Sequence, residues 1–359
     1  MAVASLTLLV LNSGSSSLRA TLFRGGEGIR HWHFSGITDH EGALQSLLKD
    51  LEGQCPEGVV HRLVHGGAIT EVARVIDGVE RSRLEALVPL APLHLPANLR
   101  GVDLCTAYFP VPQIACFDTA FHATLPALAM RLPIPARFHL RKFGFHGLSY
   151  AHLARRLPEV LGLRRALGRV VGMHLGQGVS ACLLHHLTSV ETTMGYSPAG
   201  GLVMGTRSGD LDPGVILALG LELTWDELAQ VVYHEMGLWA LSGGISADMK
   251  TLLADGREEA RFAVEFFCRR VAQSVGGMAT LLGGLDALVF TGGIGEHAGA
   301  VRSLIVQSLS FLGFALDEGA NQENALLIST AQSLPVLIIS ADEEDLMREV
   351  ATPLFTLRH

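Results

Sequence analysis

Short apolar runs, each followed by a bend rich in glycine or serine, form the main pattern along this chain. Residues 6–23 predict a buried strand, a turn at residues 12–17 (NSGSSS) and a returning strand. Residues 170–184 predict a second strand, turn and return, with Gly-Gln-Gly at residues 176–178. Both bends combine a side-chain amide with glycine, and small hydroxyl residues follow. This repetition predicts two related α/β halves.

A third glycine-rich bend, residues 291–296 (TGGIGE), follows a strand at residues 287–290 and precedes a predicted helix. Bends of this kind offer backbone N–H groups to an anion, and a helix N-terminus favours phosphate or ribose. A single bend of this kind usually does no more than join two strands. The chain contains neither the Walker pattern nor Gly-x-Gly-x-x-Gly after its first strand, which disfavours a P-loop or dinucleotide fold.

The segment 201–214 (GLVMGTRSGDLDPG) is too rich in glycine for a helix or a regular strand. Its arginine, Arg207, has a planar fork of donors that matches phosphate oxygens. Asp210 and Asp212 are expected to restrain that fork or to hold a metal ion that bridges phosphates. The alternative is a polar surface loop with a salt bridge.

Three further polar residues stand at the ends of apolar segments. Arg62 and Asp118 each end a predicted strand, and His146 lies between an aromatic residue and glycine. Open α/β sheets bind ligands at the carboxyl ends of their strands. For any one of these residues, a capping or packing role is an equal alternative to catalysis.

An acidic run at residues 342–345 (DEED) opens the last predicted helix. Ser340 and Glu343 fit a capping box, which would by itself explain this glutamate. A magnesium-related role for Glu343 is the competing interpretation.

Composition excludes several classes of protein. The chain has 359 residues, 48% of them hydrophobic and 17% charged, which fits two packed domains. Its net charge of −8 argues against a nucleic-acid partner. No apolar run is long enough to span a bilayer and the N-terminus lacks the features of a signal peptide, so no membrane partner is expected. Five widely spaced cysteines fit reduced thiols in the cytoplasm. The sequence lacks the motif His-Glu-x-x-His, so nothing in it points to a zinc site of that kind.

Ten ordered blocks along nearly the whole chain resemble the acetate kinase family, the acetate/propionate (acetokinase) kinases. They are LNSGSSSLR, HRLVHGG, LAPLHLP, FDTAFH, FGFHGLSY, HLGQGVS, GYSPAGGLVMGTRSGDLDPG, SGGISADMK, FTGGIGEH and SADEED. The resemblance implies an α/β fold of two ribonuclease-H-like (actin/sugar-kinase-like) domains with a nucleotide cleft between them, as a homodimer. We expect residues 1–118 plus 345–359 to form the N-terminal domain, closed by the C-terminal helix, and residues 119–344 the C-terminal nucleotide-binding domain.

The resemblance also implies roles for individual residues. The catalytic residues would be Arg62, Asp118, His146 and Arg207. Those for phosphate and nucleotide would be Asn12, Ser15, Ser17, Arg19, His174, Gly176, Gln177, Gly178, Asp248, Lys250, Gly292, Gly293, Ile294, Gly295 and Glu296. A small pocket for the substrate methyl group would consist of Val64, Leu93, Phe145 and Pro198, and Asn12 and Glu343 would be associated with the metal.

The implied activity is Mg²⁺-dependent (or Mn²⁺-dependent) reversible transfer of a phosphoryl group from ATP to acetate, giving acetyl phosphate and ADP. Gln177, Lys250 and His297 depart from the family's usual asparagine, arginine and asparagine. Since the last two lie where the family holds adenosine, a donor other than ATP stays open as an alternative. So do propionate or butyrate as the acid, and a non-catalytic nucleotide-binding regulator on the same fold.

Overall fold

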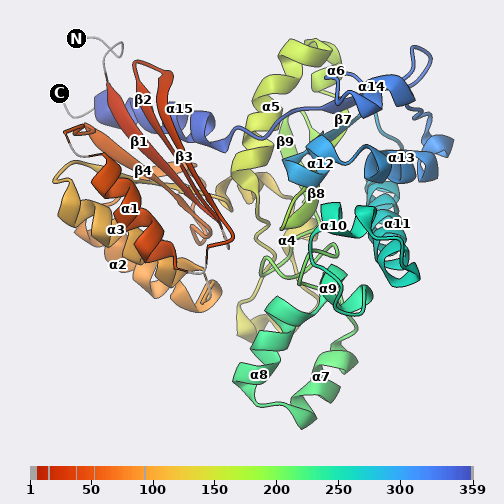
Figure 1. Cartoon of the computed structure of the whole chain (residues 1–359), viewed down its shortest axis with the longest axis horizontal. Coiled ribbons are helices and arrows are strands. Elements are labelled where there is room, and N and C mark those ends of the chain that lie inside the picture. The colour runs from red at the N-terminus through yellow and green to blue at the C-terminus, as the bar shows by residue number, and fades with distance from the viewer. Residues whose placement is uncertain (1–5, 15–16, 38, 52, 93, 357–359) are drawn as a thin grey trace. The chain divides into compact units, whose positions relative to one another are not determined.

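The chain forms two compact units in the computed structural model, which describes residues 6–14, 17–37, 39–51, 53–92 and 94–356 (Figure 1). Unit 1 comprises residues 1–123, 147–152 and 342–359, and unit 2 comprises residues 124–146 and 153–341. The predicted domain boundaries at 118/119 and 344/345 lie near these divisions and stay a prediction.

Unit 1 is built on a six-stranded sheet with the order β3-β2-β1-β4-β6-β5. β1 pairs with β2 antiparallel and with β4 parallel, and β4 pairs with β6 parallel. The strands are β1 (Thr7–Ser13), β2 (Ser17–Arg24), β3 (Glu27–Ser35), β4 (Gly58–Leu63), β5 (Ala73–Val75) and β6 (Gln113–Phe117). The main helices are α1 (His40–Asp50), α2 (Gly78–Ala86), α3 (Leu95–Tyr108) and α15 (Glu343–Thr356).

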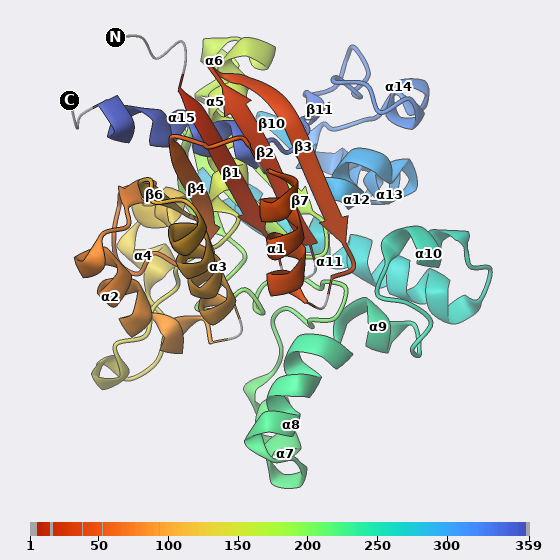
Figure 2. The same ribbon diagram turned by 60° about the vertical axis from the view of Figure 1, so that its left-hand side comes forward.

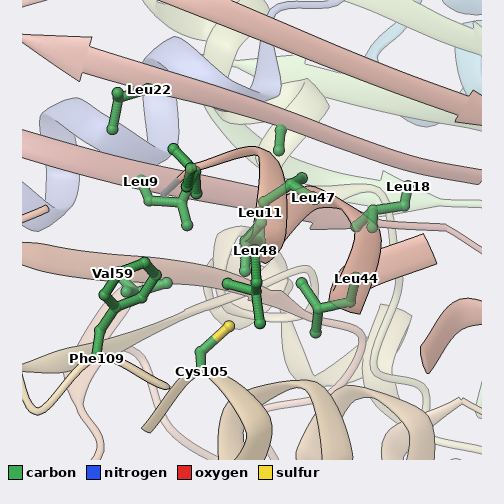
Figure 3. Packing of buried hydrophobic residues seen from close by; sticks show 12 residues of the cluster. Leu9, Leu11, Leu18, Leu22, Leu44, Leu47, Leu48, Val59, Cys105 and Phe109 are labelled. Carbon is green, nitrogen blue, oxygen red and sulfur yellow. The ribbon is translucent and has the colours of Figure 1, made fainter. Parts of the chain in front are cut away.

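The core of unit 1 follows from the alternation of side chains along β1. Leu9 and Leu11 lie on the face that packs against α1 and α3, and Figure 3 shows the leucines of α1 turned toward these strands. Leu8 and Val10 lie on the opposite face, where Leu346 of α15 packs. Burial on both faces explains why the strand reads as an unbroken apolar run.

Unit 2 repeats the arrangement of unit 1. Its five-stranded sheet has the order β11-β10-β7-β8-β9, with β7 antiparallel to β8 and parallel to β10. This order matches β6-β4-β1-β2-β3, which confirms the predicted duplication. The strands are β7 (Arg169–Leu175), β8 (Val179–His185), β9 (Thr188–Thr192), β10 (Ala287–Thr291) and β11 (Val336–Ile338).

Helices surround the sheet of unit 2, and the longest is α11 (Glu258–Leu282), which buries one apolar stripe and ends at the left-handed Gly283. α7 (Pro213–Glu222) and α8 (Trp225–Gln230) extend away from this sheet (Figure 2). The others are α4 (Ala127–Met130), α6 (Leu163–Ala166), α9 (Gly237–Leu241), α10 (Met249–Ala254), α12 (Gly292–His297), α13 (Gly299–Ser308) and α14 (Glu318–Gln322). α5 (Gly147–Leu161) begins in unit 1 and continues in unit 2.

Two predicted bends differ from the observed structure. Asn12 and Ser13 continue β1, where they pair with Arg19 and Leu18, and Ser17 already belongs to β2. The predicted turn over residues 12–17 is therefore wrong at both ends, because ladder pairing persists up to the glycine. Residues 292–296 form the helical turn α12 and not an open bend. In the described residues, no helix has the length and apolar character needed to cross a membrane.

Candidate functional site

The carboxyl ends of β4 and β6 bring Arg62 and Asp118 together in unit 1. The two strands run parallel and in register, so a residue at the end of β4 lies beside the residue that follows β6. The Arg62 guanidinium donates one hydrogen bond to Asp118 Oδ2 and another, of 2.8 Å, to the backbone oxygen of Ser13. Its Nε lies 4.0 Å from Glu343. Two carboxylates therefore face one arginine.

Burial changes the pKa of this aspartate. Asp118 is 1% exposed, and its burial raises the pKa of the carboxyl to about 6, against the opposing effect of the Arg62 charge. Glu343 adds a like charge that also raises this pKa. At neutral pH the carboxyl remains ionised, so it holds the arginine fork in place.

Asn12 lies beside the acidic start of α15. Its side-chain amide donates to Glu343 at 2.8 Å and to Glu344 at 3.3 Å. Arg19 approaches Glu344 to 3.5 Å, and burial raises the pKa of the Glu344 carboxyl. Asn12, Arg19 and Glu343, expected separately from the sequence, thus belong to one cluster.

The predicted capping box at the start of this helix is wrong. α15 begins at Glu343, and the side chain of Asp342 accepts the hydrogen bond from the Asp345 N–H at 3.0 Å. Asp342 takes the cap because it stands directly before the first helical residue. Glu343 is therefore not used as a capping-box glutamate, and its carboxylate meets Asn12.

These side chains suit a metal ion that a nucleotide carries. Mg²⁺ usually keeps several waters and takes only one or two carboxylates from the protein, along with substrate phosphates. Glu343, with its neighbour Asn12, supplies such an oxygen set. Among the described residues, no group of three or more His, Cys, Asp or Glu side chains could hold a metal ion by itself.

In unit 2, His146 is held by three constraints. Its backbone is left-handed, with φ of 58°. Its Nδ1 lies 2.9 Å from the hydroxyl of the buried Ser180, and its ring packs against the tilted ring of His174 with 4.2 Å between centroids. Sequence reasoning missed Ser180. The hairpin would have revealed it, since a bend at Gly176–Gly178 places Ser180 opposite His174.

Arg207 is the second arginine of the expected set, and no described carboxylate pairs with it. Its guanidinium donates 2.7 Å to the backbone oxygen of Pro198 and reaches that of Gln177 at 3.5 Å. Burial lowers the pKa of this guanidinium to about 10, so the group stays charged at neutral pH.

The neighbouring aspartates bond to the backbone and do not restrain Arg207, so that part of the expectation is wrong, and the alternative that they hold a metal ion stays a prediction. Asp210 accepts the Gly201 N–H at 2.7 Å, and Asp212 accepts the Gly214 N–H at the start of α7. Gly209 has φ of 71°, and a Cβ there would come within 2.4 Å of the Gly201 oxygen. The segment before α7 is without helix or strand, as predicted.

The imidazole of His146 and the guanidinium of Arg207 converge above Gly178. A Cβ built on this glycine would lie 2.8 Å from His146 Nε2 and 3.5 Å from a terminal nitrogen of Arg207. The missing side chain leaves room for the atoms of a ligand at the point where both nitrogens meet. A guanidinium beside an imidazole nitrogen is chemically suited to an anion, provided that this nitrogen carries a proton.

The start of α12 adjoins the same bend. A Cβ on Gly176 would lie 4.0 Å from the Gly293 N, and Gly295 contributes its oxygen to the buried Arg302. Glu296 accepts the N–H groups of Gly292 and Ala341 at 2.9 and 3.0 Å. Its carboxylate therefore stabilises the turn directly, and a role in binding nucleotide stays a prediction.

The other predicted residues remain predictions. Asp248 caps α10 through Thr251, and Lys250 is exposed on that helix. Val64 is buried in unit 1, whereas Phe145 and Pro198 are buried in unit 2. Ile294 lies within α12, and Ser15 and Leu93 lie outside the described residues.

Asp118 should titrate well above an ordinary aspartate, whose pKa is 3.8. Since the folded chain binds this proton more tightly, the contribution of the carboxyl to stability is full below about pH 4 and is lost as pH rises through about 6. Carboxyl-carbon NMR, assigned with Asp118→Asn, should give a midpoint near 6. Glu343→Gln should lower that midpoint, and Glu85→Gln on exposed α2 should not. A midpoint near 4 that Glu343→Gln leaves unchanged would contradict the prediction.

Comparison with known proteins identifies the family of this chain. The model of the acetokinase family matches residues 25–349. The chain is 41% identical to an acetate kinase of Rhodopseudomonas palustris, over 95% of this chain and 96% of that protein. It is also 41% identical to a propionate kinase of Citrobacter rodentium, over 86% and 81%.

Solved structures agree with the family match. A propionate kinase from Francisella tularensis superposes with a TM-score of 0.87 at 30% identity, covering 96% of this chain and 98% of that one. An acetate kinase from Porphyromonas gingivalis superposes with a TM-score of 0.85 at 30% identity, covering 98% and 100%. With the repeated sheets and the ordered motifs, these matches show that the chain belongs to the acetokinase family.

Proposed function

We propose that this chain is an acetate kinase, which transfers the terminal phosphoryl group of ATP to acetate in a direct and reversible in-line step. The observation that carries the proposal is the convergence of His146 Nε2 and the Arg207 guanidinium above Gly178. A partly buried cation held only by carbonyl oxygens is costly unless an anion completes its surroundings. The transferring phosphoryl group is such an anion.

The acceptor needs no general base. Acetate titrates well below neutral pH, as carboxylic acids of this type do, so it is already a nucleophile. Asp118 is already committed to Arg62, which supports an orienting role and not proton removal. The work left to the protein is to align two anions and to stabilise charge on the transferring group.

Each polar residue then has a defined task. Arg62 and Arg207 bind phosphoryl and carboxylate oxygens, and His146 donates from Nε2 to an oxygen of the transferring group. Asn12 and Glu343 hold the magnesium ion (or manganese) that accompanies the nucleotide. When bound, that ion neutralises charge on the phosphates.

The acid and the donor are the finer parts of the proposal. Relatives named acetate kinase and propionate kinase share the family, so the acid depends on the apolar pocket. Val64 and Phe145 match the positions that the resemblance implies for the methyl group, and this supports the smaller acid. The glycine turn of α12 supports ATP, although Lys250 supplies no stacking plane for the base.

A hydroxamate assay for acyl phosphate tests the activity. With Mg-ATP, acetate should be the best acceptor, with propionate lower by about 10-fold or more and butyrate lower still, because a small apolar pocket discriminates by about 1–3 kcal/mol per methylene. Mg-GTP and pyrophosphate serve as alternative donors. Acyl phosphate from none of the three acids would favour a nucleotide-binding regulator, and activity with pyrophosphate alone would overturn ATP as the donor.

Arg207→Ala should lower kcat by about 10³-fold or more, by analogy with arginine fingers, because its charge acts on the transition state. Nucleotide affinity, measured by calorimetry, should change far less. Arg164→Ala on exposed α6 is the matched control and should keep full activity. A variant that retains a tenth of the wild-type kcat would remove Arg207 from the catalytic set.

We further propose that the chain is a cytoplasmic homodimer whose contact lies on α7. None of the residues of α7 is buried, yet they are almost all apolar, and Leu217 and Leu221 are 73% and 89% exposed. Trp225, at the start of α8, is 84% exposed. An apolar helix of this kind is normally buried, and a second copy of the chain would cover it. The free state of all five cysteines supports a reducing compartment.

Light scattering after gel filtration tests this contact. Leu217→Asp with Leu221→Asp should convert a dimer into a monomer, since the two leucines share one face of α7. Leu128→Asp, at a position 96% exposed on α4, should leave the dimer intact. A dimer that survives the paired substitution would place the interface elsewhere.

A further inference from the structure

Ser180 lies beside His146 in unit 2, and the proposed phosphoryl transfer gives it no task. It lies in β8 directly opposite His174, and its side chain is fully buried. Its hydroxyl is 2.9 Å from His146 Nδ1. A serine hydroxyl can donate or accept at that distance, so the proton on the imidazole decides the direction of the bond.

The other ring nitrogen determines which direction is useful. His146 Nε2 is the atom that faces Gly178, where Arg207 also points. Nε2 can donate to a phosphoryl oxygen only when it carries a proton. In the neutral ring, a proton on Nε2 leaves a lone pair on Nδ1, and that lone pair needs a donor.

We propose that Ser180 is a positioning residue that donates its hydroxyl proton to His146 Nδ1 and so keeps the imidazole in the tautomer protonated at Nε2. The proposal rests on the proposed phosphoryl transfer for the use made of Nε2, but the tautomer itself is a property of the chain. The left-handed backbone of His146 and the neighbouring ring of His174, with 4.2 Å between ring centroids, hold the imidazole while Ser180 selects the proton position.

Histidines that bind metals through one ring nitrogen are oriented in a similar way, by a hydrogen-bond partner on the other ring nitrogen. Such partners are typically worth about 10–100-fold in activity. Because Ser180 touches neither the substrate nor the nucleotide in this proposal, its loss should lower kcat without raising KM for acetate or ATP in proportion.

The test uses two variants of equal shape. Ser180→Thr keeps the hydroxyl and Ser180→Val replaces it with a methyl group, so any cost of the larger side chain in this buried strand is common to both. Ser180→Val should lower kcat by about 10–100-fold relative to Ser180→Thr, with KM values similar within about threefold. In a His146→Ala background, the difference between the two should vanish, because the hydroxyl acts through the imidazole.

Nitrogen NMR of the histidine side chains gives a readout that does not depend on activity. The His146 resonances, assigned by their loss in His146→Ala, should show the proton on Nε2 in the wild type and in Ser180→Thr, and a mixture of tautomers in Ser180→Val. If Ser180→Val retains the Nε2 proton, or if both variants lose activity equally, the positioning role is overturned. If the wild type makes no acyl phosphate but the tautomer responds as expected, it is the proposed function that fails.

Discussion

Hydrogen-bond pairing between a hairpin and one parallel strand is the constraint on which both units depend. In unit 1, β1 pairs with β2 on one side and with β4 on the other, and in unit 2, β7 does the same with β8 and β10. This pairing places the bend of each hairpin at the edge where the parallel strand ends. Arg62 donates to the backbone oxygen of Ser13 at that edge in unit 1, and Gly178 and α12 adjoin it in unit 2. The polar residues gather there because backbone ladders end there.

The two sets of polar residues differ in charge. In unit 1, Arg62 is matched by Asp118 and approached by Glu343, while Glu344 faces Arg19. In unit 2, Arg207 is held by backbone oxygens and no described carboxylate pairs with it. A buried cation that lacks a counter-ion reduces stability, and proteins keep such groups where a ligand supplies the missing charge. The difference supports the proposal that unit 1 orients an arginine and holds the metal ion, and that unit 2 binds the anion.

Much of this arrangement could be predicted from the sequence because it depends on local patterns. Apolar runs identified the strands of both hairpins, and their repetition identified the duplicated sheets. The positions of Arg62 and Asp118 at strand ends also followed from the apolar runs, whereas their ion pair depends on the parallel pairing of those strands, which the runs alone did not indicate. What could not be predicted depends on competition between partners at close range. Asp342, and not Ser340, caps α15. Asp210 accepts the backbone N–H of Gly201 and therefore does not pair with Arg207. The extension of ladder pairing through Asn12 could not be predicted either, because nothing in the turn residues indicates where the hydrogen bonding stops.

The left-handed backbone of His146 restricts which substitutions this position can tolerate. At φ of 58°, most side chains crowd their own backbone, and asparagine, aspartate and glycine tolerate the conformation best. Most single replacements of this histidine therefore lose an imidazole and strain a turn at once. Asparagine tolerates the left-handed backbone and also retains an amide N–H donor. Among relatives that diverge in chemistry, a change at this position should consequently pass through asparagine more readily than through a β-branched residue.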